Sequence, residues 1–265
     1  MPFYSLRNGA APIDSTTILI TCEHGGNRVP APYRKLFAKH ADILPTHQGW
    51  DPGALTLARE MAAALDVPLF AATTTRLLID LNRSIGTPRL YSEVTKALPA
   101  EARREIVAKH YRAHLEPIEA WVEAARRAGK RVVHIASHSF TPELNGQVRT
   151  ADVGFLYDPA RPGEVELANR WIAALRELRP ELRLRRNYPY LGDSDGLTFR
   201  LRRRHPPDGY IGIELEVNQR FVLQGGRPWS RLRRSLVDSL RCALAEPAFD
   251  SPAVRAVRAP RRDTR

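Results

Sequence analysis

Histidine, arginine and carboxylate side chains recur near the ends of strand-like runs in this sequence. His24, Asn82 with Arg83, His138 and Glu216 each lie at or near the end of an apolar run. In open α/β sheets, ligands bind in the crevice outside the carboxyl ends of the strands, so residues distant in sequence can converge there. We therefore expect one polar site at that edge of a sheet.

These residue types together support metal-assisted hydrolysis. Two histidines and a carboxylate can hold a catalytic zinc ion that keeps one coordination position open for water. Zinc lowers the pKa of that water to about 7 and polarises a carbonyl, while a carboxylate outside the metal site can act as general base. An arginine can bind a substrate carboxylate through two parallel hydrogen bonds. The sequence holds a candidate for each part, although spacing alone does not assign them.

The remaining histidines fit structural roles better. His110 and His114 are four residues apart on a predicted helix, but the segment lacks the glutamate of HExxH, so we expect them to be structural or to support a ligand. His134 is expected in the core of a strand. His40 and His205 have charged neighbours in the sequence and are expected on the surface.

Cysteine and nucleotide-binding chemistry are both disfavoured. Cys22 and Cys242 are too far apart for a CxxC site, and we expect both to be buried as small apolar residues. A Cys22 nucleophile ranks below the metal site. Neither GxxxxGK[ST] nor GxGxxG occurs in the sequence, which argues against nucleotide-dependent reactions.

The elements that must position these residues alternate between strand and helix. Apolar, β-branched runs predict strands over 17–22, 69–70, 73–79, 131–137, 153–157, 182–186 and 209–217. Helical spacing and start signals predict helices over 51–65, 99–129, 164–178 and 230–244, with Asp51 as the first N-cap. Alternation in the last strand places Glu214 and Glu216 on one face. This order predicts a single α/β domain whose mixed, mostly parallel central sheet is flanked by helices.

Charge and length bound the alternatives. The chain has 265 residues with 41 Lys and Arg against 29 Asp and Glu, a net charge of +12. The arginines are spread along the chain, apart from a run at Arg200, Arg202, Arg203 and Arg204 and a second group near the end. We expect a solvated face for the run and a flexible Arg/Pro-rich tail over 248–265, after a domain over 1–247. No apolar run is long enough for a membrane span and no secretory signal is visible, so a cytoplasmic protein without a membrane partner is expected.

Seven short stretches, taken in order, resemble the N-formylglutamate amidohydrolase family. They are Thr21–Pro30, Trp50–Ala54, Asp80–Arg83, Ser137–Phe140, Arg149–Gly154, Asn187–Tyr190 and Glu214–Gln219. Each is weak alone, but together they keep the family order, and the resemblance extends over roughly residues 17 to 225. The resemblance implies a fold like that of zinc carboxypeptidases and aspartoacylases. It also implies zinc-dependent hydrolysis of a C–N amide bond in a carboxylated substrate.

The resemblance also implies a metal site with one zinc ion per chain. In the wider group the first ligands come as HxxE, whereas this chain has His24-Gly-Gly-Asn27 and lacks the glutamate. Asp51 is our choice for the carboxylate ligand, with Glu23 and then His47 as alternatives. His138 completes the predicted set.

Further roles follow from the same motifs. Glu216 matches the late-strand glutamate of the family and is predicted to be the base that activates water, with Glu214 as the alternative. Arg83, assisted by Asn82, is predicted to bind the substrate carboxylate. Other candidates for substrate binding are Arg149, Asn187 and Tyr190.

The substrate is expected to be a small anionic amide. N-formylglutamate, cleaved to glutamate and formate, is the nearest choice, although other N-acyl amino acids and γ-glutamyl or peptide-like amides fit as well. The spread of the arginines argues against a nucleic-acid partner, and association of identical chains is left open. Two rival hypotheses remain: a basic nucleic-acid-binding protein that uses the arginine clusters, and a family member that has lost its metal.

Overall fold

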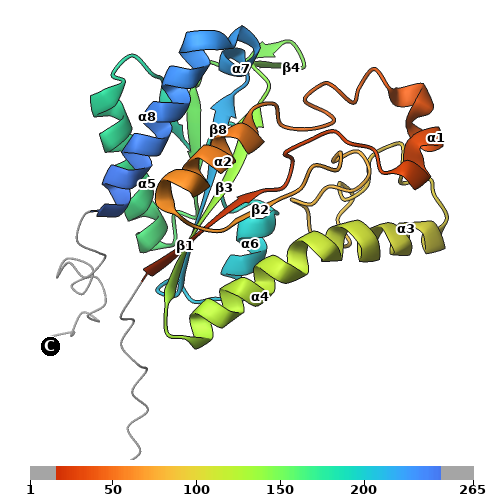
Figure 1. Ribbon diagram of the computed structural model, residues 1–265, viewed down its shortest axis with the longest axis horizontal. Helices are drawn as coiled ribbons and strands as arrows, with labels where there is room; N and C mark the ends of the chain where they lie inside the picture. Colours follow the sequence, from red (N-terminus) through yellow and green to blue (C-terminus); the bar gives the residue numbers. More distant parts are fainter. Residues whose placement is uncertain (1–15, 246–265) are drawn as a thin grey trace, which may run out of the picture.

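A six-stranded sheet with helices on both faces organises the protein (Figure 1). The computed structural model describes residues 16–245, so the tail predicted over 248–265 lies outside the described residues. Within 16–245, no helix has the length and apolar character that a membrane crossing requires.

The sheet has the strand order β2-β1-β3-β8-β6-β7. The first four strands run parallel, whereas β6 pairs antiparallel with β8, and β7 runs parallel to β6. The strands are β1 Thr16–Cys22, β2 Leu69–Ala71, β3 Arg131–Phe140, β6 Val153–Leu156, β7 Leu184–Arg186 and β8 Tyr210–Asn218. A separate hairpin consists of β4 Glu143–Leu144 and β5 Gln147–Val148. These observations confirm the predicted α/β class with a mixed, mostly parallel sheet.

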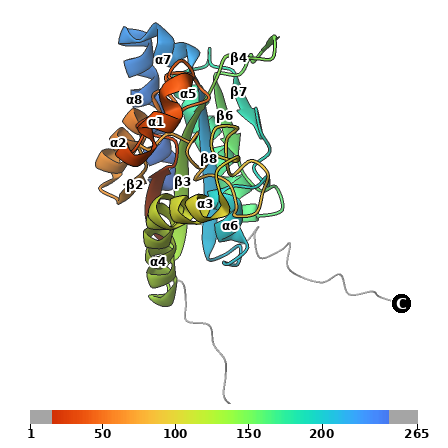
Figure 2. The ribbon, with the colours of Figure 1, turned by 90° about the vertical axis from the view of Figure 1, so that its right-hand side faces the viewer.

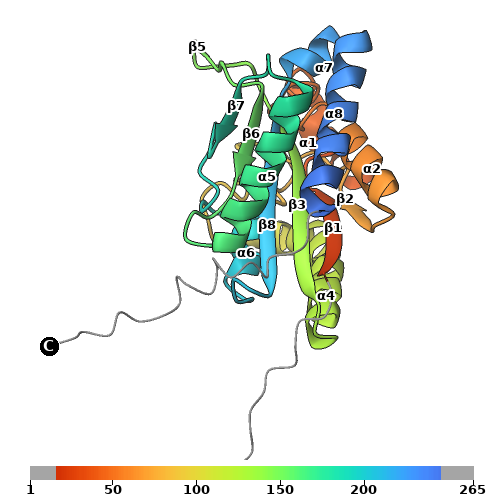
Figure 3. The same cartoon turned by 90° about the vertical axis from the view of Figure 1, so that its left-hand side faces the viewer.

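Two helical layers cover the sheet. The helices α2, α5 and α8 lie together on one face (Figure 3), and α4 and α6 lie on the other (Figure 2). The helices with eight or more residues are α2 Ala54–Leu65, α4 Ala113–Arg127, α5 Pro162–Leu178 and α8 Gly226–Ala245. The shorter ones are α1 Arg34–Phe37, α3 Ala100–Ile106, α6 Leu197–Arg202 and α7 Arg220–Gln224. A π-helical segment, Val107–Arg112, joins α3 to α4, so the predicted helix over 99–129 is continuous but not regular.

Strand β8 shows how the sheet separates core from site. Its apolar residues Ile211, Ile213, Leu215 and Val217 pack in the core with α2, α5 and α8. The alternate residues, including Glu214 and Glu216, therefore point to the opposite face, as the alternation predicted. Irregular segments rather than long helices cover that face above the carboxyl end of β3.

Two predicted elements are wrong in part. Residues 73–79 form turns and one isolated bridge from Thr74 to Arg28, because Thr75 Oγ1 donates to Gly49 O (2.9 Å) and accepts from Leu77 N (3.3 Å). Helix α2 begins at Ala54 with Gly53 as N-cap, so Asp51 is not the cap. Gly53 has φ 82°, a backbone conformation that a side chain rarely adopts.

Several expected exposures are also wrong. Cys242 is exposed, although Cys22 and His134 are fully buried as expected. His205 is buried rather than superficial, and His40 is half-buried. Arg202, expected on a solvated face, is buried because its guanidinium pairs with Glu164.

Candidate active site

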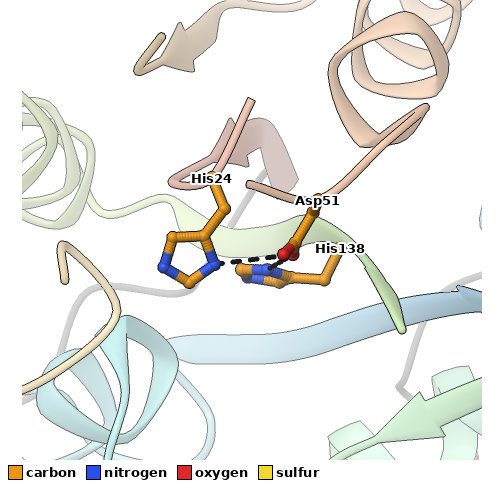
Figure 4. Close-up of side chains that lie close together, drawn as sticks. All are labelled: His24, Asp51 and His138. Atoms are coloured by element: carbon orange, nitrogen blue, oxygen red, sulfur yellow. Dashed lines mark hydrogen bonds and ion pairs between the residues drawn. The ribbon is translucent and has the colours of Figure 1, made fainter. Parts of the chain in front are cut away.

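Two histidines converge on one carboxylate at the carboxyl end of the parallel strands (Figure 4). His24 follows β1, Asp51 precedes α2, and His138 lies within β3. Asp51 Oδ2 is 2.9 Å from His138 Nδ1 and 3.4 Å from His24 Nδ1. All three residues are buried, and one potential ligand atom from each lies within 4.8 Å of the others. The structure thus brings together the three residues predicted to hold a metal.

Each histidine ring is also held from its far side. His24 Nε2 lies 2.7 Å from Asp80 Oδ1, and His138 Nε2 lies 3.0 Å from Glu23 Oε2. Because a carboxylate accepts a hydrogen bond from a ring N–H, Asp80 and Glu23 orient the two rings so that both Nδ1 atoms face Asp51. Glu23 therefore lies at Nε2 of His138, where it can orient the ring. It does not lie at Nδ1, the atom that faces Asp51.

Arg76 connects Asp51 and Asp80, and the sequence analysis did not identify it. Its guanidinium lies 2.7 Å from Asp80 Oδ2 and 3.3 Å from Asp51 Oδ1. Its charge and that of His24 hold the pKa of Asp80 well below its ordinary value, against the opposing effect of burial. The apolar residues around Arg76 predicted a strand, so only its single charge within that run could have drawn attention to it.

The residues fit a divalent metal ion. Buried polar atoms in proteins are nearly always hydrogen-bonded. Among the described residues, however, His24 Nδ1 is buried without a hydrogen-bond partner, although it lies at ion-pair distance from Asp51. Two imidazole nitrogens and one carboxylate form a donor set that suits zinc. His47, an alternative ligand, is not part of this group.

Electrostatics separate the two glutamates of β8. Glu216 is the register partner of His138, and burial raises its pKa to about 8, with Asp51 and Glu214 adding to the effect. Within residues 16–245 its Oε2 is buried without a hydrogen-bond partner. Glu214, in contrast, accepts a hydrogen bond from the hydroxyl of Thr198. Of the two glutamates, Glu216 therefore has a carboxylate oxygen that no hydrogen bond occupies and that can accept a proton.

A cavity of about 540 Å³ opens onto this group. Asn82, Arg83 and Tyr190 line it, together with His24, Asp51, His138, Glu214 and Glu216. Arg83 donates to Asn82 O (3.1 Å) and to Asp195 O, which fixes its guanidinium at the wall. Further charged residues that line the cavity, and that the sequence analysis did not single out, are Arg76, Arg89 and Asp195.

Arg149 and Asn187 lie outside the lining of this cavity. Arg149 Nη1 donates to the Tyr190 hydroxyl (3.2 Å), so it reaches the wall through that side chain. Asn187 Oδ1 accepts from Tyr157 N (2.9 Å) and Gly192 N (3.2 Å), which holds the loop that carries Tyr190. Roles for these two residues in substrate binding stay predictions.

Comparisons with solved structures give the fold. A crystal structure of gene product Atu2144 from Agrobacterium tumefaciens is 28% identical, with a TM-score of 0.74, over 87% of this chain and 91% of that chain. An N-formylglutamate amidohydrolase from Ralstonia eutropha JMP134 is 21% identical, with a TM-score of 0.63, over 89% and 96%. A metallo-carboxypeptidase from Burkholderia cenocepacia is 13% identical, with a TM-score of 0.37, over 88% and 56%, which is too distant to carry an argument.

The sequence itself gives the more direct result. No curated protein matches it. Residues 16–223, however, match the family model described as N-formylglutamate amidohydrolase. Because this match spans most of the chain, the protein belongs to the N-formylglutamate amidohydrolase family and is a hydrolase of carbon–nitrogen bonds.

Proposed function

We propose that the protein is a zinc-dependent amidohydrolase that cleaves the C–N amide bond of an N-formyl or N-acyl amino acid. N-formylglutamate is the first candidate substrate. One observation carries the proposal: the Nδ1 atoms of His24 and His138 converge on Asp51 Oδ2, beside the unpartnered carboxylate oxygen of Glu216. A metal-binding group next to an available base is the arrangement that metal-assisted amide hydrolysis uses.

The chain supplies the proton transfer and the positioning. His24, Asp51 and His138 would hold the ion, which when bound supplies a Lewis acid that polarises the carbonyl and acidifies water. Glu216 Oε2 accepts a proton from the attacking water and later gives it to the leaving amine nitrogen. The water oxygen first forms a bond to the carbonyl carbon, and the carbon–nitrogen bond breaks when the amine nitrogen takes up the proton. Arg83 orients the substrate by binding its carboxylate.

Elemental analysis tests the metal part of this proposal. Protein purified without chelator and without a metal-affinity tag is expected to contain about one zinc ion per chain. His24→Ala and His138→Ala should both lose it, because each removes one of the two nitrogen ligands. His40→Ala is the matched control, since His40 lies on a short helix outside the metal-binding group.

Two outcomes would contradict the proposal. Protein that contains no metal and takes up none when zinc is added would remove the metal-dependent mechanism. Zinc that stays bound in both histidine variants would place the metal elsewhere. With zinc present, release of glutamate and formate from N-formylglutamate then tests the substrate.

A further inference from the structure

We infer that the cavity accepts an acyl group that is apolar and larger than formyl, so that the substrates include N-acyl amino acids with a hydrocarbon acyl chain. This inference rests on the proposed function, because it assigns the acyl half of the same substrate. A formyl group is about the size of two water molecules, which occupy roughly 60 Å³ in the liquid. The cavity of about 540 Å³ leaves ample space beyond a formyl group and an amino acid.

Part of the cavity lining is apolar, and we call this part the apolar wall. It consists of Leu144, Leu156, Leu191 and the ring of Tyr190, whose hydroxyl accepts from Arg149. Tyr190 and Leu191 are 46% and 61% exposed, although apolar side chains of this size gain free energy when they are covered. Their exposure at the mouth of a cavity that also contains the metal-binding group indicates a surface that an apolar ligand covers.

This wall lies next to the proposed base. Leu156 is the register partner of Glu214, and Gly154 is the register partner of Glu216. A Cβ on Gly154 would lie 1.9 Å from Tyr188 O, so this glycine allows the loop that carries Tyr190 and Leu191 to pack beside Glu216. The attacked carbonyl carbon must lie near Glu216, and the acyl chain extends from that carbon. The first space the chain meets is therefore the space along this wall.

The amino-acid half has a different partner in the cavity. Arg83 and Arg89 line it from the segment that follows Asp80, and Arg89 has no ion pair among the residues that the structure describes. Guanidinium groups favour a carboxylate over a hydrocarbon. The charged and apolar linings thus come from separate segments, which suits a substrate with a carboxylated end and an apolar end.

A series of acyl groups tests the inference. N-acetyl-, N-butanoyl- and N-hexanoylglutamate differ only in acyl length, and formyl is left out because its carbonyl is intrinsically more reactive. We expect kcat/KM to rise about two- to fourfold per methylene, as the partial burial of each group predicts. Leu191→Ser should flatten this slope. Leu223→Ser is the matched control, since Leu223 is 74% exposed and lies on α7 away from the cavity.

The outcomes separate this inference from the function on which it rests. A flat or falling slope would overturn it, and so would a slope that Leu191→Ser leaves unchanged. Hydrolysis of N-formylglutamate but of none of these compounds would overturn the inference and leave the proposed function intact. If N-formylglutamate is not hydrolysed either, the proposed function fails, and calorimetric binding of the same compounds decides the inference. Tighter binding of N-hexanoylglutamate than of N-acetylglutamate would support it, whereas equal affinities would overturn it.

Discussion

Two buried clusters of charged side chains contact strand β8 at positions that are four residues apart, Gly212 and Glu216. The two clusters differ in their hydrogen bonding. The Glu164 cluster, formed by Arg161, Glu164 and Arg202, contacts Gly212. Glu164 accepts from Arg202 Nε (2.9 Å), Asp158 N (2.8 Å) and Gly212 N (3.1 Å). Arg161 donates to the carbonyl oxygens of Tyr210, Arg202 and His205. Every charge in this cluster is compensated.

The site cluster, formed by Glu23, His24, Asp51, Asp80 and His138, contacts Glu216. In the part of the chain that the structure describes, the hydrogen-bond capacity of five buried atoms is not met: both oxygens of Glu23, His24 Nδ1, His138 Nε2 and Glu216 Oε2. The first four lie at ion-pair distance from a neighbour, with His138 Nε2 3.0 Å from Glu23 Oε2, whereas Glu216 Oε2 has no such contact. Burial and charge are therefore common to both clusters, and only the unpartnered atoms distinguish them. A saturated cluster stabilises a fold, whereas unpartnered buried atoms indicate a group that a ligand completes.

Removing the proposed base should give the largest effect. Glu216→Gln keeps the shape of the side chain but cannot accept the proton, so kcat/KM should fall by about 10²- to 10⁴-fold. Zinc content and the free energy of unfolding should not fall, because Glu216 makes no hydrogen bond that glutamine would lose. The measurement is steady-state kinetics with metal analysis of the same sample.

Glu214→Gln is the control for this prediction. Its carboxylate already accepts the Thr198 hydroxyl, so its loss should reduce kcat/KM less. If Glu214→Gln abolishes turnover while Glu216→Gln retains it, the two glutamates have been assigned in the wrong order.

The Glu164 cluster should respond in stability instead. Arg202→Met leaves the buried Glu164 without its partner, which should lower the free energy of unfolding by about 3–5 kcal/mol. Urea denaturation measures this change. Folded Arg202→Met should retain its zinc, and replacing Glu164 by leucine as well should recover part of the loss. Loss of zinc from the folded variant would show that the two clusters are coupled.

Sequence patterns predicted the parts of the fold and site that depend on local regularity. The apolar runs of β1, β3 and β8 placed His24, His138 and Glu216 near the same edge of the sheet. Alternation alone assigned Glu214 and Glu216 to one face. The family motifs then added Asp51, which the structure places 2.9 Å from His138.

Long-range contacts account for the rest. Residues 73–79 have a strand-like composition, but Thr75 and Arg76 bind Gly49 and Asp51, which are about 25 residues earlier in the chain. Asp51 at a helix start fits an N-cap and a metal ligand equally well from sequence. Arg202 belongs to a basic run, and only its contact with Glu164, 38 residues away, explains its burial.

Two histidines on β3 offer the comparison within a single strand. His134 has partners at both ring nitrogens, Thr21 Oγ1 at 2.8 Å and the Tyr210 hydroxyl at 2.6 Å. Burial lowers the pKa of His134 to about 4, chiefly by desolvation. In the unfolded chain its pKa is about 6.5, so the unfolded state binds the proton first as the pH falls. The free energy of unfolding should therefore fall by about 3 kcal/mol as the pH falls from about 6.5 to 4.

Denaturation curves at pH 7, 5 and 4 measure this loss. His134→Gln removes the titrating group, so its free energy of unfolding should decline less over that range than that of the unmodified protein. Parallel declines would show that His134 is not the group responsible.

The smallest effect should come from a carboxylate that supports a ligand without binding the metal. Asp80→Asn retains an oxygen that can accept from His24 Nε2 but removes the negative charge that polarises the ring. Such changes behind a metal ligand weaken affinity by about 10- to 100-fold. We therefore expect the zinc dissociation constant to rise by that factor, as measured by competition with a chelator of known affinity.

Glu60→Gln is the matched control, because Glu60 also pairs with an arginine, Arg233, but lies on α2 outside the site cluster. It should leave the zinc affinity unchanged. Equal affinity in Asp80→Asn and the unmodified protein would mean that the Arg76 and Asp80 pair only stabilises the fold. Asp80 would then stabilise the fold, as the Glu164 cluster does. The site would then consist only of the residues that have unpartnered buried atoms.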